Sequence, residues 1–204
     1  MKTIYKLIAS MMTLMALNSF ATAQTLQLDT SESKIEWIGR KVTGQHNGTL
    51  NFASGSIKMD EGTVKSGEFK IDMASLTVLD LTDPDMNAKL TGHLKSDDFF
   101  SVATHPKAVL TLKSVESKDK QNSLYHVSGD LTIKGITNEI VFPATIIKMQ
   151  EGYHAHADFK LDRTLWDVRF RSGKFFENLG DKLIYDDFDV KLDLRFLDES
   201  MATE

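Results

Sequence analysis

The chain has 204 residues and a formal net charge of −5 at pH 7, from 24 lysines and arginines against 29 aspartates and glutamates. An acidic chain is a poor match for nucleic acid, so we expect no nucleic-acid partner. The absence of cysteine excludes disulfides, thiolate metal sites and a cysteine nucleophile. With three prolines and no Gly/Ser-rich linker, the sequence favours one domain with a sizeable core.

Residues 1–23 have the pattern of a secretory signal peptide. Lys2 and Lys6 precede an apolar run, residues 7–17, that is too short to span a bilayer. Small residues precede Gln24, where a signal peptidase would cut. We therefore expect cleavage after residue 23, a mature domain over 24–204, and a periplasmic or secreted location. No later segment is apolar enough to cross a membrane, so we expect no stable membrane insertion.

Most of the remaining sequence alternates between apolar and polar residues, which is typical of strands with one buried face. Eight runs show this alternation: 34–39, 48–52, 67–73, 107–115, 124–135, 139–147, 153–161 and 186–196. Their connections are mostly short, which favours antiparallel pairing because parallel neighbours need long crossovers. A sheet of this size with one apolar face must close into a barrel or fold into a sandwich. Pro143 lies inside one run, so we expect it at an edge or a bulge.

The segment from residue 82 to 96 breaks this alternation. Apolar residues recur there at spacings of four, as on one face of a helix: Met86, Leu90 and Leu94. Thr82 or Asp83 can cap this helix, and Pro84 suits its first turn. We therefore predict a short helical insertion around residues 83–100.

The end of this predicted helix carries groups that occur in active sites. They are His93, Lys95, Asp97 and Asp98. His93 and Lys95 lie about 100° to either side of the inward-facing residue between them, so these groups do not easily converge on one reacting atom. The sequence also has no Gly-x-Ser-x-Gly motif. We predict no catalytic residue, and keep as the alternative a secreted lipid-modifying enzyme that uses His93 with Asp97 or Asp98.

Two histidines on the run 153–161 share one face of the predicted strand. His154 and His156 could hold a metal from there, because imidazole is a common metal ligand. Their face also carries Asp158 and Lys160, and no third ligand can be named. We expect no metal site, although surface binding of a metal by these histidines stays open.

The segment 162–188 holds the densest basic cluster. Guanidinium groups bind phosphate and carboxylate in two-point contacts, which makes Arg169, Arg171 and Lys174 candidates for a ligand head group. The simpler interpretation is salt bridging to nearby carboxylates. These are Asp162, Asp167, Asp181 and Asp186.

The inward faces of the predicted strands suggest a cavity. An eight-stranded barrel is either filled by its own side chains or holds one ligand, and the small residues Ala155 and Ala157 favour the second case. The candidate ligand-binding residues that line this cavity are Trp37, Phe52, Phe69, Ile71, Val127, Leu131, Tyr153, Ala155, Ala157 and Phe159.

Four long segments resemble the YceI family of exported lipid-binding proteins: 37–55, 93–100, 127–144 and 162–188. The last of them is similar to the branch common in Bacteroidetes-type bacteria. The resemblance implies an all-β, lipocalin-like antiparallel barrel with a helical insertion. It also implies an elongated apolar cavity for a polyisoprenoid or similar chain, and no shared catalytic residue.

We therefore expect non-catalytic binding, transport or storage of a long-chain amphiphilic lipid, with no cofactor beyond a bound isoprenoid or other long-chain lipid. The partner is a hydrophobic small molecule, and a homodimer stays open. A different interpretation is a structural or stress protein whose barrel is filled by its own side chains. The sequence does not identify the lipid.

Overall fold

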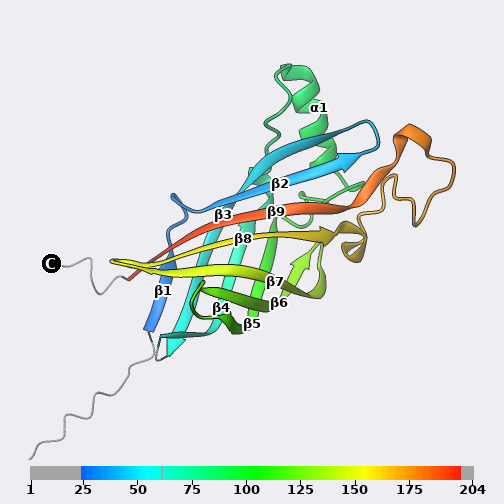
Figure 1. Ribbon diagram of the computed structural model, residues 1–204. Coiled ribbons are helices and arrows are strands. Elements are labelled where there is room, and N and C mark those ends of the chain that lie inside the picture. Colours follow the sequence, from blue (N-terminus) through cyan, green and yellow to red (C-terminus); the bar gives the residue numbers. More distant parts are fainter. Residues whose placement is uncertain (1–23, 61, 199–204) are drawn as a thin grey trace, which may run out of the picture.

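The computed structural model describes residues 24–60 and 62–198 (Figure 1). Within them lie the strands β1 (Gln24–Leu28), β2 (Lys34–Lys41), β3 (Gly44–Asp60), β4 (Thr63–Asp72), β5 (Lys107–Asp119), β6 (Leu124–Ile133), β7 (Ile136–Met149), β8 (Gly152–Asp162) and β9 (Ile184–Leu197). The connections hold the helix α1 (Pro84–Lys95) and the 3-10 turns η1 (Met73–Ser75), η2 (Arg163–Trp166) and η3 (Gly180–Lys182). The predicted signal peptide lies outside the described residues.

The strands close into an antiparallel barrel with eight strand positions. The order of neighbours is β3-β2-β9-β8-β7-β6-β5-β4, and β4 pairs back with β3. The ninth strand, β1, continues the position of β2, because it pairs with residues 56–59 of β3 and 196–197 of β9, beyond the ladders of β2. The predicted eight-stranded antiparallel barrel is confirmed, and β1 is a short addition that the sequence pattern did not reveal.

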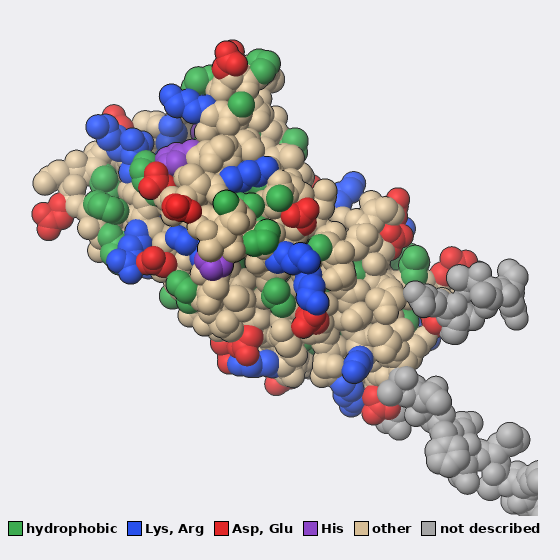
Figure 2. Space-filling view, turned by 180° about the vertical axis from the view of Figure 1, so that it is seen from behind, with side chains coloured by type: hydrophobic (Ala, Val, Ile, Leu, Met, Phe, Trp, Pro, Cys, Tyr) green, Lys and Arg blue, Asp and Glu red, His purple; other side chains and the backbone are tan. Residues whose placement is uncertain are grey.

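Apolar side chains from the alternating strands meet inside the barrel and form its core. The rings of Phe52 and Phe69 lie 6.2 Å apart between centroids, and those of Phe69 and Phe196 lie 6.0 Å apart. On the outside, seen from behind in Figure 2, basic and acidic side chains are interspersed. Burial of one strand face is favourable only when the sheet closes, which explains the barrel.

The strands β7 and β8 pair over a short stretch, residues 145–149 with 152–156. Before residue 145, β7 pairs with β6 alone. Pro143 therefore lies on a free edge of the ladder, as expected for a residue that has no N–H to donate.

Aromatic side chains pack where β7 and β8 diverge. Phe142 and Phe159 stack face to face, with ring centroids 4.3 Å apart and an interplanar angle of 15°. Trp166 of η2 is fully buried, and its Nε1–H donates to the carbonyl oxygen of Leu131 at 3.0 Å. The turn η2 is thereby anchored to the barrel wall at β6.

The helix α1 starts at the predicted position. The Asp83 carboxylate accepts a hydrogen bond from the N–H of Met86 at 2.9 Å, with Pro84 in the first turn. The predicted apolar stripe is buried only in part: Met86 is 55% exposed, and Leu90 and Leu94 are half-buried. The helix therefore lies over one end of the barrel rather than in the core. The segment that follows β8 lies at the same end (Figure 1).

Candidate functional site

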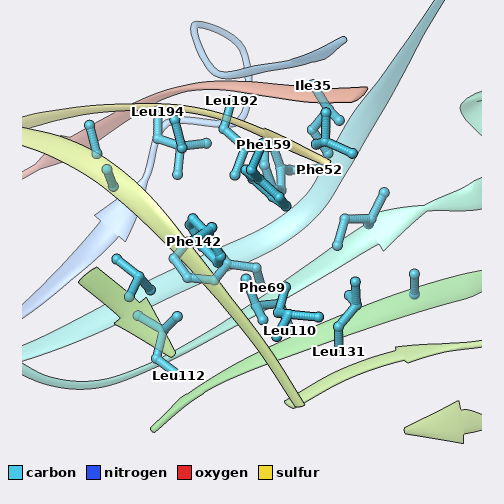
Figure 3. A pocket seen from close by; sticks show the side chains of 18 of the residues that line it. Ile35, Phe52, Phe69, Leu110, Leu112, Leu131, Phe142, Phe159, Leu192 and Leu194 are labelled. Atoms are coloured by element: carbon cyan, nitrogen blue, oxygen red, sulfur yellow. The ribbon is translucent and has the colours of Figure 1, made fainter. Parts of the chain in front are cut away.

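The barrel contains an apolar cavity of about 160 Å³, shown in Figure 3. Each strand from β2 to β9 contributes inward side chains, and the accessible wall is apolar throughout. The labelled residues are Ile35, Phe52, Phe69, Leu110, Leu112, Leu131, Phe142, Phe159, Leu192 and Leu194. A dry apolar cavity of about 150 Å³ is large enough to take a small apolar guest.

All but one of the predicted lining residues lie on the wall of this cavity. They are Phe52, Phe69, Ile71, Val127, Leu131, Tyr153, Ala155, Ala157 and Phe159. Trp37 does not line the cavity; it lines a second pocket. That these residues bind a ligand stays a prediction.

Two alanines of β8 contribute to the open space. Ala155 lies opposite Leu194 of β9, and Ala157 lies opposite Leu192. All four line the cavity, and Ala157 is buried. A larger residue at either alanine would extend into the cavity, because side chains at these positions point inward.

The second pocket has a volume of about 140 Å³ and lies beneath α1. Leu90 and Leu94 of the helix line it, and so does Trp37 of β2. Three residues line both this pocket and the cavity: Leu50, Phe100 and Phe188. These three residues border both spaces, and we refer to them as the partition.

The indole nitrogen of Trp37 is the one buried nitrogen without a hydrogen-bond partner among the side chains that the structure describes. Buried indole N–H groups usually donate to an acceptor, as Trp166 does here. Trp37 therefore carries a buried donor that the described protein groups leave unused.

Arg163, which also lines the second pocket, is buried, and its guanidinium is occupied by protein acceptors. These acceptors are the carbonyl oxygens of Val168, Ile184 and Tyr185 and the carboxylate of Asp186. Burial lowers the pKa of Arg163, and the charges of Asp186 and Asp162 oppose this shift. The guanidinium ties η2 to the start of β9.

The predicted head-group residues Arg169, Arg171 and Lys174 line neither space. Each makes a contact near itself in the chain: Arg169 pairs with Asp167, Arg171 lies over the ring of Phe170, and Lys174 pairs with Asp162. Arg169 and Lys174 therefore form salt bridges with nearby carboxylates, as the simpler interpretation expected. A head-group role for these residues stays a prediction that the geometry does not favour.

The groups of the enzyme alternative line neither space. The Nε2 of His93 lies 3.1 Å from a carboxylate oxygen of Asp98, and its ring packs edge-on against Phe170 with centroids 4.6 Å apart. Asp97 instead accepts a hydrogen bond from the hydroxyl of Ser101. The two carboxylates therefore have separate partners, and only Asp98 reaches the imidazole.

The two histidines of β8 do not share a partner. The Nε2 of His154 lies 2.8 Å from a carboxylate oxygen of Asp193, and His156 is exposed. Across residues 24–60 and 62–198, no group of three or more metal-binding side chains is placed to hold an ion. In the same part of the chain, no helix has the length and apolar character to cross a bilayer.

Residues 26–196 match the YceI-like domain family. The chain belongs to this family. Protein YceI of Escherichia coli is 32% identical over 106 residues, which cover 50% of this chain and 53% of that protein. The chain spans about half the length of the curated relatives it matches. A Bacteroidetes-type branch within the YceI-like family stays a prediction.

Solved structures show the same fold. BcnA of Burkholderia cenocepacia has a TM-score of 0.66 at 21% identity, over 82% of this chain and 98% of that one. A polyisoprenoid binding domain from Saccharophagus degradans, implicated in plant cell wall breakdown, has a TM-score of 0.59 at 17% identity, over 87% of this chain and 99% of that one. At these identities the likeness concerns the fold of the YceI-like chain.

The second pocket was missed from the sequence. Its wall combines β2, the helix α1, the turn η2 and the start of β9, which are far apart along the chain. Alternation assigns a residue to the inner face of a strand, but not to one of two spaces at different heights in a barrel. The one local signal was Gly48, which lies opposite Trp37 in the β2–β3 ladder and lets the indole pack against the backbone.

Proposed function

We propose that this protein binds a long-chain amphiphilic lipid, a polyisoprenoid or a similar chain, and carries or stores it without changing it chemically. The observation that carries this proposal is the apolar cavity enclosed by the barrel strands. The polyisoprenoid binding domain from Saccharophagus degradans shares the fold, which supports this class of ligand.

The energetics of binding such a chain are favourable. Burial of about ten methylene groups at ~0.8 kcal/mol each yields roughly 8 kcal/mol of transfer free energy. This corresponds to an affinity of about 1 μM before ordering costs are subtracted. An apolar cavity without polar groups provides this term and little else, so we expect tolerance to variation in the chain.

The volume of the cavity sets a condition on this proposal. Pockets for drug-sized ligands measure roughly 300–1,000 Å³, whereas the cavity measures about 160 Å³ and the second pocket about 140 Å³. A long chain therefore needs both spaces, and Leu50, Phe100 and Phe188 must move apart to join them. We propose that these three side chains change conformation when the lipid chain enters.

We also propose that the protein works outside the cytoplasm, on the basis of the signal-peptide pattern in residues 1–23. Protein recovered from the periplasmic or secreted fraction is expected to begin at Gln24. Full-length protein in the cytoplasmic fraction would contradict this location without affecting the binding proposal.

Mass spectrometry of an organic extract tests the function. Purified protein is extracted and then incubated with prenyl and acyl chains to measure uptake. An intact bound lipid, or uptake of an added chain, supports the carrier. A cleaved or rearranged product would favour the enzyme alternative, and an empty extract with no uptake would favour a barrel filled by its own side chains.

A further inference from the structure

Four exposed apolar side chains lie at the end of the barrel where the β2–β3 hairpin and the segment between β8 and β9 protrude (Figure 1). They are Val42 after β2, Phe175 and Phe176 of the connecting segment, and Tyr185 of β9, and each is between 45% and 49% exposed. We call these four residues the aromatic surface. Single exposed apolar residues are ordinary, but several in one place often mark an interaction site.

Backbone hydrogen bonds join the three segments that carry the aromatic surface. The N–H of Val42 donates to the carbonyl oxygen of Leu183 at 3.2 Å. The N–H of Ile184 donates to the carbonyl oxygen of Arg171 at 3.0 Å. The hairpin tip, the start of β9 and the connecting segment are therefore neighbours in space.

The connecting segment folds around a buried serine and leaves its two phenylalanines outside. Ser172 is fully buried, and its carbonyl oxygen accepts the N–H groups of Phe175 at 3.2 Å and Phe176 at 3.0 Å. The Ser172 hydroxyl also accepts the N–H of Lys174 at 3.2 Å. Burial of the two rings in the core would be favourable, yet these hydrogen bonds hold them at the surface. Their exposure therefore belongs to the fold of the segment.

Cationic side chains flank the exposed rings. The guanidinium of Arg169 lies 4.7 Å from the ring centroid of Phe175. Arg171 is exposed and lies over the ring of Phe170 at 5.0 Å. Guanidinium groups bind phosphate, and apolar rings on a basic surface insert at the boundary between the head groups and the acyl chains of a bilayer. The combination matches the surface of a phospholipid membrane.

The aromatic surface also borders the second pocket. Tyr185 lines this pocket together with Lys41, the residue before Val42, and both are exposed to solvent. Transfer of a long apolar chain through water is unfavourable. A chain that moves between a bilayer and the second pocket beside Tyr185 avoids most of that transfer.

We propose that the aromatic surface docks this protein reversibly on a phospholipid bilayer, and that the lipid passes between the bilayer and the second pocket beside Tyr185. This inference rests on the proposed function. The rings of Phe175 and Phe176 insert at the boundary between head groups and acyl chains, and the flanking cations meet the phosphates. Exposed carboxylates, Glu177 and Asp181, lie in the same segment, so insertion of the rings contributes more to docking than charge does.

Flotation with vesicles of phosphatidylethanolamine and phosphatidylglycerol tests the docking. The double variant Phe175→Ser with Phe176→Ser should reduce the bound fraction about tenfold, because two apolar side chains no longer leave water. Ile147→Ser with Met149→Ser is the matched control: these residues are 46% and 51% exposed, by the β7–β8 hairpin at the other end of the barrel (Figure 1). All proteins are compared in the same form of the chain, so residues 1–23 contribute equally. Equal binding by the two double variants would overturn the inference.

A fluorescent label reports which part of the protein meets the membrane. The chain has no cysteine, so Phe176→Cys accepts a single polarity-sensitive dye. Its emission should shift to shorter wavelength when vesicles are added, and the emission of the same dye at Ile147→Cys should stay unchanged. A protein that floats with the vesicles without a shift at position 176 would contact them through another surface, which would contradict the proposal.

Uptake of a pyrene-labelled fatty acid separates docking from the proposed function. The unmodified protein and both double variants should bind the free probe equally, whereas transfer of the probe from vesicles should be about tenfold slower with Phe175→Ser and Phe176→Ser. If no protein takes up the probe, the proposed function fails, and the passage of lipid fails with it. Uptake without vesicle binding overturns this inference alone. So does a double phenylalanine variant that floats normally but changes from dimer to monomer in ultracentrifugation, because the surface would then join two copies of the chain.

Discussion

At the scale of single residues, Gly48 determines where the indole of Trp37 lies. It is buried in β3, opposite Trp37 in the ladder with β2. The carbonyl oxygen of Thr77 approaches so closely that no Cβ fits between them. The glycine thus serves close backbone approach, and the position of the indole follows from it.

The pair Gly48→Ala and Gly39→Ala tests this role. Gly48→Ala should lower the free energy of unfolding by about 2 kcal/mol or more, because a Cβ would overlap the carbonyl of Thr77. Gly39→Ala should change it by less than about 1 kcal/mol, since its Cβ meets only an ordinary contact. Urea denaturation followed by circular dichroism measures both. Equal losses in the two variants would contradict this account.

At the scale of elements, α1 is held over the barrel by polar contacts rather than by burial. Asn87 donates to the carbonyl oxygens of Val78 and Leu81 at 2.9 and 3.0 Å. Lys95 donates to the carbonyl oxygen of Ala74 at 2.7 Å. No residue of the helix is fully buried. Elements with few buried apolar contacts open more readily than the core, so α1 is suited to uncover the second pocket.

Asp83→Ala should loosen this helix without unfolding the barrel. Loss of a side-chain N-cap costs about 1 kcal/mol, which corresponds to roughly fivefold faster hydrogen exchange of the α1 amides. Exchange in the barrel strands should not change. Asp85→Ala is the control, since Asp85 lies in the first turn but does not provide the cap. The same acceleration in both variants would show that the cap is unimportant.

Asp162 stabilises the start of the segment that connects β8 and β9. Burial raises the pKa of this carboxyl, but hydrogen bonds from Lys174 and Thr164 outweigh it and hold the pKa below its ordinary value. A lowered carboxyl pKa adds stability above the ordinary value of about 3.9, and this stability is lost as the pH falls through the folded-state pKa.

Acid should therefore loosen this segment below about pH 4, where carboxyl groups with ordinary pKa values already take up protons. The melting temperature of the wild type should fall between pH 7 and pH 3, and Asp162→Asn should show a smaller fall from a lower starting value. Asp181→Asn, which removes an exposed carboxylate of the same segment, should follow the wild type. Identical pH profiles for all three proteins would show that the Asp162 carboxylate does not stabilise this segment.

At the scale of the whole molecule, the barrel encloses apolar volume that its own side chains do not fill. Close packing is the norm in protein interiors, and a residual cavity is destabilising. Here the small residues of β8 lie beside that volume, and the partition side chains divide it from the second pocket. A barrel arranged in this way has lower stability when empty than when filled by an apolar guest.

Ala157→Trp tests whether this volume is available to a ligand. The added indole would occupy the cavity, so binding of a fluorescent acyl or prenyl probe should fall by about tenfold or more while the melting temperature changes little. Asp158→Trp places the same group on the neighbouring, outward position and should leave binding intact. A loss of about 1–3 kcal/mol of stability in Ala157→Trp, with no effect on probe binding, would indicate overpacking of a full core.

Several features followed from local patterns in the sequence. The period of two in β8 places Tyr153, Ala155, Ala157 and Phe159 inward, because successive side chains in a strand point to opposite faces. The start of α1 followed from Asp83 and Pro84, because a cap and a proline act on their own turn. These expectations were reliable since their physical causes lie within a few residues.

Other features depend on which distant segments meet. Trp37 has the inward parity of its strand, yet it lies in the second pocket because α1 and the start of β9 cover that end of the barrel. Arg163 is buried against the carbonyl oxygens that lead into β9, whereas Arg169 is exposed and paired with Asp167, although both belong to one basic segment. Burial and hydrogen-bond partners arise from contacts between segments far apart in the chain, and no local period encodes them.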